Sequence, residues 1–156
     1  MKHSSNNRSG LFLLEIIIAI LFFAMVSAVC LRAFAKSHTL SRQASDTNYA
    51  ISNMESIAEL LKAVDSADLK EESKITETLQ IVYPKVSVKD HTWHIYFDSD
   101  WKNCAENIAS YQIVILADES NISAGLCSYE LTAENISDNA QNTQIEQFTL
   151  KLHAKE

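Results

Sequence analysis

The chain has 156 residues and a formal net charge of −7, and from residue 37 onward it carries 9 Lys and Arg against 19 Asp and Glu. This acidic part repels phosphate backbones, so no direct binding of nucleic acid is expected. The sequence also lacks the spacing of a Ser–His–acid triad, a phosphate-binding loop and a cluster of Cys and His. We therefore expect neither an enzyme nor a bound cofactor.

An apolar segment of membrane length begins directly after Gly10. The residues before this glycine are polar or basic and include Lys2 and Arg8. Leu11–Leu31 is apolar apart from one Glu and one Ser. At about 1.5 Å per residue this segment spans the roughly 30 Å hydrocarbon core of a bilayer. We expect a membrane-spanning helix over residues 11–34.

Glu15 is the acidic residue inside this segment. A lone carboxylate at mid-bilayer costs roughly 2.5 to 3.5 kcal/mol, and somewhat less near an end, so it is interpreted first as functional. The alternative is that Glu15 reaches the membrane surface with its side chain or is protonated.

These residues resemble the N-terminal motif of the type IV pilins and type II secretion pseudopilins. Precursors in that family carry a short basic leader, a glycine at which prepilin peptidase cuts, and an apolar helix with Glu in the fifth position after the cut. Gly10 and Glu15 match this spacing, with residues 1–10 as the leader. The usual polar residue before the Glu is missing here. No proline precedes Pro84, where many major pilins have one in the helix, which favours a minor pilin or pseudopilin.

The resemblance implies a processing and assembly pathway. Prepilin peptidase would cut between Gly10 and Leu11 and N-methylate Leu11. The leader would lie in the cytoplasm, the helix in the inner or cytoplasmic membrane, and the C-terminal domain outside it. Partners would be other pilins, an assembly platform and its ATPase, in a type IV pilus, a competence pilus or a type II secretion apparatus. Glu15 would pair with the α-amine of Leu11 in a neighbouring subunit, which would fix the register of the filament.

Other kinds of export signal remain alternatives. Val26-Ser27-Ala28 and Ala33-Phe34-Ala35 are small-residue sites that a signal peptidase could cut, although an acid-free apolar region of about 7 to 15 residues is usual in such signals. A lipoprotein cut before Cys30 fits less well, since Val29 precedes it. The competing class of protein is therefore a single-pass anchored or secreted binding domain with no role in a filament.

Beyond the membrane segment, the apolar spacing becomes that of an amphipathic helix over residues 37–64. The apolar positions follow alternating steps of four and three: Leu40, Ala44, Thr47, Ile51, Met54, Ala58 and Leu61. No Gly or Pro interrupts the chain from Leu11 onward in this region, so one continuous helix is expected, with its stripe packed on a sheet of the same chain. The charged segment Asp65–Lys74 predicts the end of the helix and a connecting loop.

The period then changes to two, which predicts β-strands. The expected strands are Leu79–Tyr83, Val86–Lys89, Trp93–Phe97, Tyr111–Leu116, Leu126–Leu131 and Glu146–Leu152. Residues 35–156 should thus form one extracytoplasmic domain. The predicted fold is α+β, a long N-terminal helix packed on a small antiparallel sheet.

Two of the three cysteines fall in this domain. A disulfide between Cys104 and Cys127 is possible in an oxidising compartment and would contribute about 3 kcal/mol in the chain-entropy model. The alternative is that Cys127 is a free thiol on the core face of its strand. Cys30 lies in the membrane segment and is expected to be an inert apolar residue.

No metal site is expected. The oxygen-bearing residues Asp98, Asp100, Asn103 and Glu106 are close in sequence but lack the glycine turn and distal Glu of a calcium loop, which favours a solvated loop. His91 and His94 would point to opposite faces of a strand and make a poor ligand pair.

Overall fold

The computed structural model describes residues 6–118, 126–137 and 143–153. The chain divides into two compact units, residues 1–44 and residues 45–156, which are described separately below. We call the second the globular unit. The first five residues of the predicted leader lie outside the described part.

Helix α1, Asn6–Ala63, supplies the whole described part of the first unit and the first element of the globular unit. Its 58 residues contain no proline and one glycine, Gly10, so no helix-breaking residue occurs between Leu11 and Ala63. The Val64 N–H donates to the Leu61 carbonyl at 3.3 Å where the helix ends. This end lies one residue before the expected boundary at residue 64.

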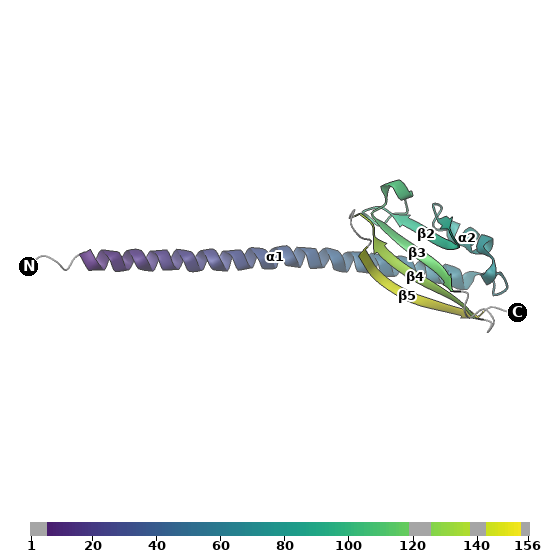
Figure 1. The fold of residues 1–156 in the computed structure, drawn as a ribbon, viewed down its shortest axis with the longest axis horizontal. Coiled ribbons are helices and arrows are strands. Elements are labelled where there is room, and N and C mark those ends of the chain that lie inside the picture. The colour runs from purple at the N-terminus through teal and green to yellow at the C-terminus, as the bar shows by residue number, and fades with distance from the viewer. Residues whose placement is uncertain (1–5, 119–125, 138–142, 154–156) are drawn as a thin grey trace, which may run out of the picture. The chain divides into compact units, whose positions relative to one another are not determined.

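The sheet of the globular unit is antiparallel, and its strands follow one another in space in sequence order, β1-β2-β3-β4-β5 (Figure 1). The predicted α+β fold, a long N-terminal helix and an antiparallel sheet, is confirmed. The bounds of the strands are β1 Ser87–Lys89, β2 Thr92–Phe97, β3 Tyr111–Asp118, β4 Leu126–Asn135 and β5 Thr143–His153.

A two-residue turn joins β1 to β2. Lys89 pairs with Thr92, and the residues between them, Asp90 and His91, have φ values of 50° and 59°. Positive φ at both central positions is the geometry of a type I′ turn, whose twist matches that of the flanking strands. Asp and His tolerate this left-handed region better than most residues, so the turn forms without glycine.

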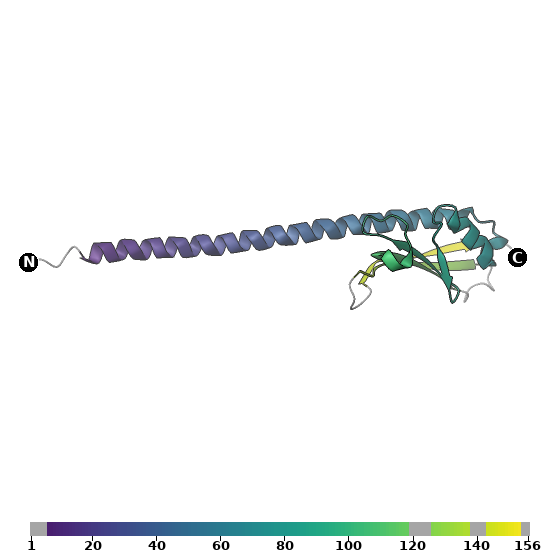
Figure 2. The same ribbon diagram turned by 90° about the horizontal axis from the view of Figure 1, so that it is seen from above.

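The core lies between the sheet and residues 45–63 of α1 (Figure 2). The buried helix residues Ala50, Met54, Ile57 and Leu61 follow steps of four, three and four and form one stripe. They contact the sheet face whose buried members are Trp93, Ile95, Phe97, Tyr111, Ile113, Ile115, Cys127, Tyr129, Leu131 and Ala133. The stripe therefore begins at Ala50, not at the expected Leu40, which is 54% exposed.

The predicted strand Leu79–Tyr83 is wrong. The charged segment Asp65–Lys74 follows the end of α1 and begins a connection, as expected, but a second helix starts within it. A short 3-10 helix, η1 (Asp68–Lys70), is followed by α2, Glu72–Gln80. Ile75 and Leu79 are buried and four residues apart, so they occupy one helix face. The spacing of four between Ile75 and Leu79 therefore decides the structure over the alternation that predicted a strand, because both side chains pack into the core. The remaining short helix is η2, Glu106–Ile108.

Candidate functional site

Gly10 and Leu11, the two residues of the predicted cleavage site, lie in α1. Gly10 is exposed, and a Cβ placed on it would meet nothing within 4 Å. Its backbone is helical, and glycine in a helix interior is less stable than alanine by roughly 0.5 to 1 kcal/mol. Neither packing nor backbone geometry accounts for a glycine here.

The apolar segment Leu11–Leu31 presents its side chains outward. The large apolar residues of this segment and the nearby Phe34 are between 41% and 77% exposed. No residue in the most apolar part of the helix is buried. Apolar patches of that extent on soluble monomers mark interfaces with membranes or proteins. By length and composition, the helix can cross a membrane once.

Glu15 lies on the same exposed part of α1. Within the described residues it makes no hydrogen bond or ion pair. The Cα atoms of Leu11 and Glu15 are one helical turn apart, roughly 6 Å along the axis. The carboxylate is therefore available to a group outside this chain.

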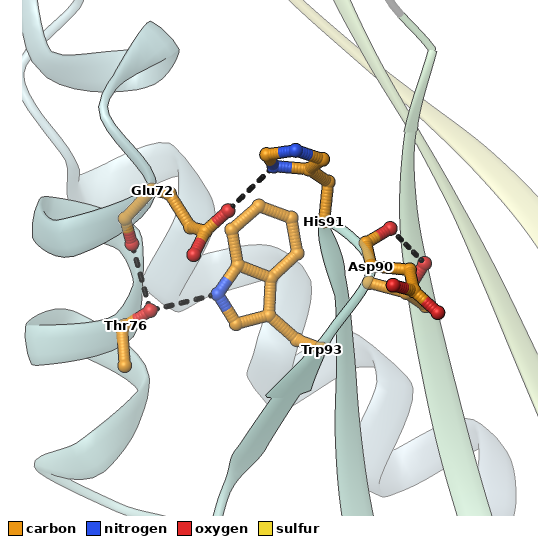
Figure 3. Close-up of polar contacts among 6 residues, drawn as sticks. Glu72, Thr76, Asp90, His91 and Trp93 are labelled. Carbon is orange, nitrogen blue, oxygen red and sulfur yellow. Dashed lines mark hydrogen bonds and ion pairs between the residues drawn. The ribbon is translucent and has the colours of Figure 1, made fainter.

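A small pocket of about 90 Å³ lies where η1 and α2 meet the sheet. At its margin the Thr76 hydroxyl accepts a hydrogen bond from the Trp93 indole N–H at 2.9 Å and donates to the Glu72 carbonyl at 2.7 Å (Figure 3). His91 Nδ1 lies 2.8 Å from a Glu72 carboxylate oxygen, in an exposed pair. Such a volume holds a few waters, well below the ~300 Å³ or more of most ligand pockets. These contacts attach α2 to the sheet.

Two of the carboxylates considered as calcium ligands, those of Asp98 and Glu106, bind groups of this chain instead. The Asp98 carboxylate accepts the N–H groups of Asp100 and Lys102 at 2.9 and 3.0 Å, and these hydrogen bonds lower its pKa. Glu106 forms an ion pair with Lys89 at 2.7 Å, which lowers the pKa of that carboxyl group. Among the described residues, no group of three or more His, Cys, Asp or Glu could hold a metal ion.

The two histidines considered as ligands do not come together. His91 occupies the β1–β2 turn, whereas His94 lies within β2 with its ring stacked near Tyr96, at 6.2 Å between centroids. Burial lowers the pKa of His94, which favours its neutral form.

Cys104 and Cys127 are free thiols in this structure, and both are buried. The Cys104 N–H donates to Tyr96 O, beside the start of β3, whereas Cys127 lies near the other end of that strand. At about 3.3 Å per residue, the two lie on the order of 20 Å apart, and a disulfide needs Cα atoms within about 7 Å. Of the two alternatives, the free buried thiol is the one observed. Burial raises the pKa of both thiols.

Sequence reasoning missed the part played by Trp101. Its φ of 59° is unusual for a bulky residue. The indole stacks on Tyr111 with centroids 4.4 Å apart and donates to the Asp46 carboxylate of α1 at 3.4 Å. These contacts join the β2–β3 connection to the helix. The only sequence signal is the isolated aromatic in a polar stretch, Asp98–Asn103.

Comparisons with protein-family models, with curated proteins and with solved structures found no match to this chain. Functional inference therefore rests on the N-terminal motif and on the geometry of the chain itself.

Proposed function

We propose that this chain is a minor pilin or pseudopilin, assembled through its N-terminal helix into a type IV pilus, a competence pilus or a type II secretion pseudopilus. The observation that carries the proposal is the spacing of Gly10, Leu11 and Glu15 at the head of an exposed apolar helix long enough to cross a membrane. The α+β architecture of the rest of the chain is consistent with a pilin-like subunit.

Gly10 supports the processing step by elimination. The helix gains no stability from a glycine at this position, and a Cβ there would meet no neighbour. Recognition by a peptidase that requires a small residue before the cut accounts for it. Cleavage between Gly10 and Leu11 by prepilin peptidase removes the leader, and the new α-amine of Leu11 is N-methylated.

Glu15 supports the assembly step through its exposed carboxylate. A buried charge is destabilising unless a partner of opposite charge and further hydrogen bonds compensate for its lost hydration. In a bundle of parallel, staggered helices, the Leu11 amine of one subunit meets the Glu15 carboxylate of its neighbour. The pair fixes how far one helix is shifted along the next.

The partners and location follow from these two steps. The leader faces the cytoplasm, the apolar segment lies in the inner or cytoplasmic membrane, and the globular unit is extracytoplasmic until the filament forms. Prepilin peptidase, other pilins and the assembly platform with its ATPase are the partners. No catalytic role is proposed for the chain itself.

The test is mass spectrometry of the mature N-terminus in chain extracted from membranes. The expected mature chain starts at N-methylated Leu11, and Gly10→Val leaves the precursor uncut. Ala28→Val is the matched control, since it alters an alternative signal-peptidase site while keeping the helix apolar. A mature chain that starts at Val29 in the wild type and is blocked by Ala28→Val, or one that starts at Lys36, would establish an exported binding domain without a filament role.

A further inference from the structure

Among the described strands, β5 is the longest, and it lies at one edge of the sheet. It has 11 residues and pairs along one side with β4; in the part of the chain that the structure describes, no strand pairs with its other side (Figure 1). The opposite edge is β1, with three residues. An unpaired edge presents a row of N–H and C=O groups that can bind another strand.

Edge strands are usually protected by charged residues, prolines or bulges, and β5 carries two charged residues, Glu146 and Lys151. It contains no proline, and its irregularity lies near its start, opposite Ala133 and Glu134. Phe148, Leu150 and Leu152 face the core yet are only partly buried. An added strand would cover both this apolar row and the backbone groups beside it.

We propose that β5 binds an extended strand of a different subunit of the same assembly, which adds a sixth strand to the sheet. This inference rests on the proposed filament function. The exposed face of β5 indicates which side chains the bound strand has. Thr149, Lys151 and His153 are exposed on this face, and Lys151 places a positive charge there in an otherwise acidic unit. The bound strand alternates apolar residues, against Phe148 and Leu150, with polar or acidic residues near Lys151.

A second copy of this chain is a poor donor of that strand. Its β1 is too short to cover β5. Two β5 strands that pair antiparallel are related by a two-fold axis perpendicular to the sheet. This axis also reverses the direction of residues 45–63 of α1. The helix ends that lead to the two membrane segments would then point in opposite directions. If the two β5 strands paired in parallel, one sheet would be turned over relative to the other. The polar face of one β5 would then lie beside Phe148 of the other. Chains anchored in one membrane with one orientation therefore do not pair through β5.

The experiment places a photo-crosslinking amino acid at Thr149, Lys151 or His153 of the full chain in membranes that contain the assembled machine. Control positions are Lys102 and Asn107, which are exposed but lie outside the strands. The expected adducts join β5 positions to one different protein. The joined residues in that protein step along one segment two at a time, as strand pairing requires. The controls give no adduct with this segment.

A second measurement uses Lys151→Glu, which should lower the yield of the Thr149 adduct roughly two- to fivefold, the effect of one cross-strand charge pair. Lys62→Glu makes the same charge change on α1 and should leave the yield unchanged.

No adduct, an adduct with a second copy of β5, or joined residues scattered over the partner would each overturn the proposal. The mature N-terminus is read from the same sample. A chain cut at Gly10 without β5 adducts refutes only the strand addition, whereas an uncut chain refutes the filament function.

Discussion

At the scale of single residues, Glu15 and Tyr129 occupy opposite environments. Glu15 is exposed and makes no hydrogen bond or ion pair among the described residues, whereas Tyr129 is 1% exposed and its hydroxyl donates to the Leu69 carbonyl at 2.6 Å. The first side chain can be changed without disturbing the fold of the globular unit. The second holds η1 against the sheet.

Glu15→Gln separates assembly from simple anchoring. A neutral amide is easier to hold in a bilayer than a carboxylate, so the variant should insert at least as well as the wild type. It should nevertheless lose the other pilins during co-purification from membranes with matched levels of chain. Undiminished recovery would remove Glu15 from assembly and favour an anchored binding domain.

Tyr129 and Tyr83 predict a loss of stability in alkali. Burial raises the pKa of both phenols above the ordinary value of 10.0. The folded state therefore keeps protons that the unfolded state releases. This stabilising effect is complete below pH 10 and should be lost as pH rises above it. Thermal unfolding of the detergent-solubilised chain between pH 8 and pH 11 measures the loss, and a flat profile would contradict it.

The cysteines give a chemical prediction at the same scale. Because Cys104 and Cys127 are free in the structure, the chain unfolded without reductant should take up an alkylating reagent at both thiols. Mass spectrometry of the alkylated peptides reports each thiol separately. Protection of both until reductant is added would mean that they are bridged.

At the scale of elements, the part of the globular unit that departs from the sequence prediction is α2. The sequence predicts a strand over Leu79–Tyr83, in which Leu79 and Ile81 would share a face. In the structure Leu79 is fully buried on α2, whereas Ile81 is 77% exposed beyond its end. The helix is attached to the sheet by the Thr76–Trp93 hydrogen bond, which no local pattern indicates.

A pair of alanine substitutions tests this assignment. Leu79→Ala should lower the free energy of unfolding by about 2 to 5 kcal/mol, because it leaves a cavity in the core. Ile81→Ala should change it by less than about 0.5 kcal/mol, as for an exposed residue. Chemical denaturation of the solubilised chain gives both values. Equal, large losses would support the strand.

Much of the fold could be predicted from sequence because its patterns are strong. Trp93, Ile95 and Phe97 alternate, and all three face the core as expected. Contacts between distant parts of the chain could not be predicted in this way. The side chains of Trp101 and Tyr129 form hydrogen bonds to residues 55 and 60 positions away, and such contacts leave no periodic trace in the sequence.

In the candidate site too, some features could be predicted from local spacing and others needed the structure. Gly10, Leu11 and Glu15 are close in sequence, so their spacing could be recognised without a structure. The absence of any packing reason for Gly10 needed coordinates. The position of β5 at the edge of the described sheet needed them too, because the order of strands in a sheet is a property of the whole chain.

At the scale of the whole molecule, the sequential strand order bears on how the globular unit is built during synthesis. Each strand pairs with the strand that precedes it in the chain, so every β-pairing closes a short loop and costs little chain entropy. The sheet can grow by one hairpin at a time as the chain emerges. Until β5 arrives, β4 is the exposed edge. A chain whose synthesis stops before β5 would thus present the edge of β4 to its surroundings, with other side chains and another backbone edge than the finished sheet.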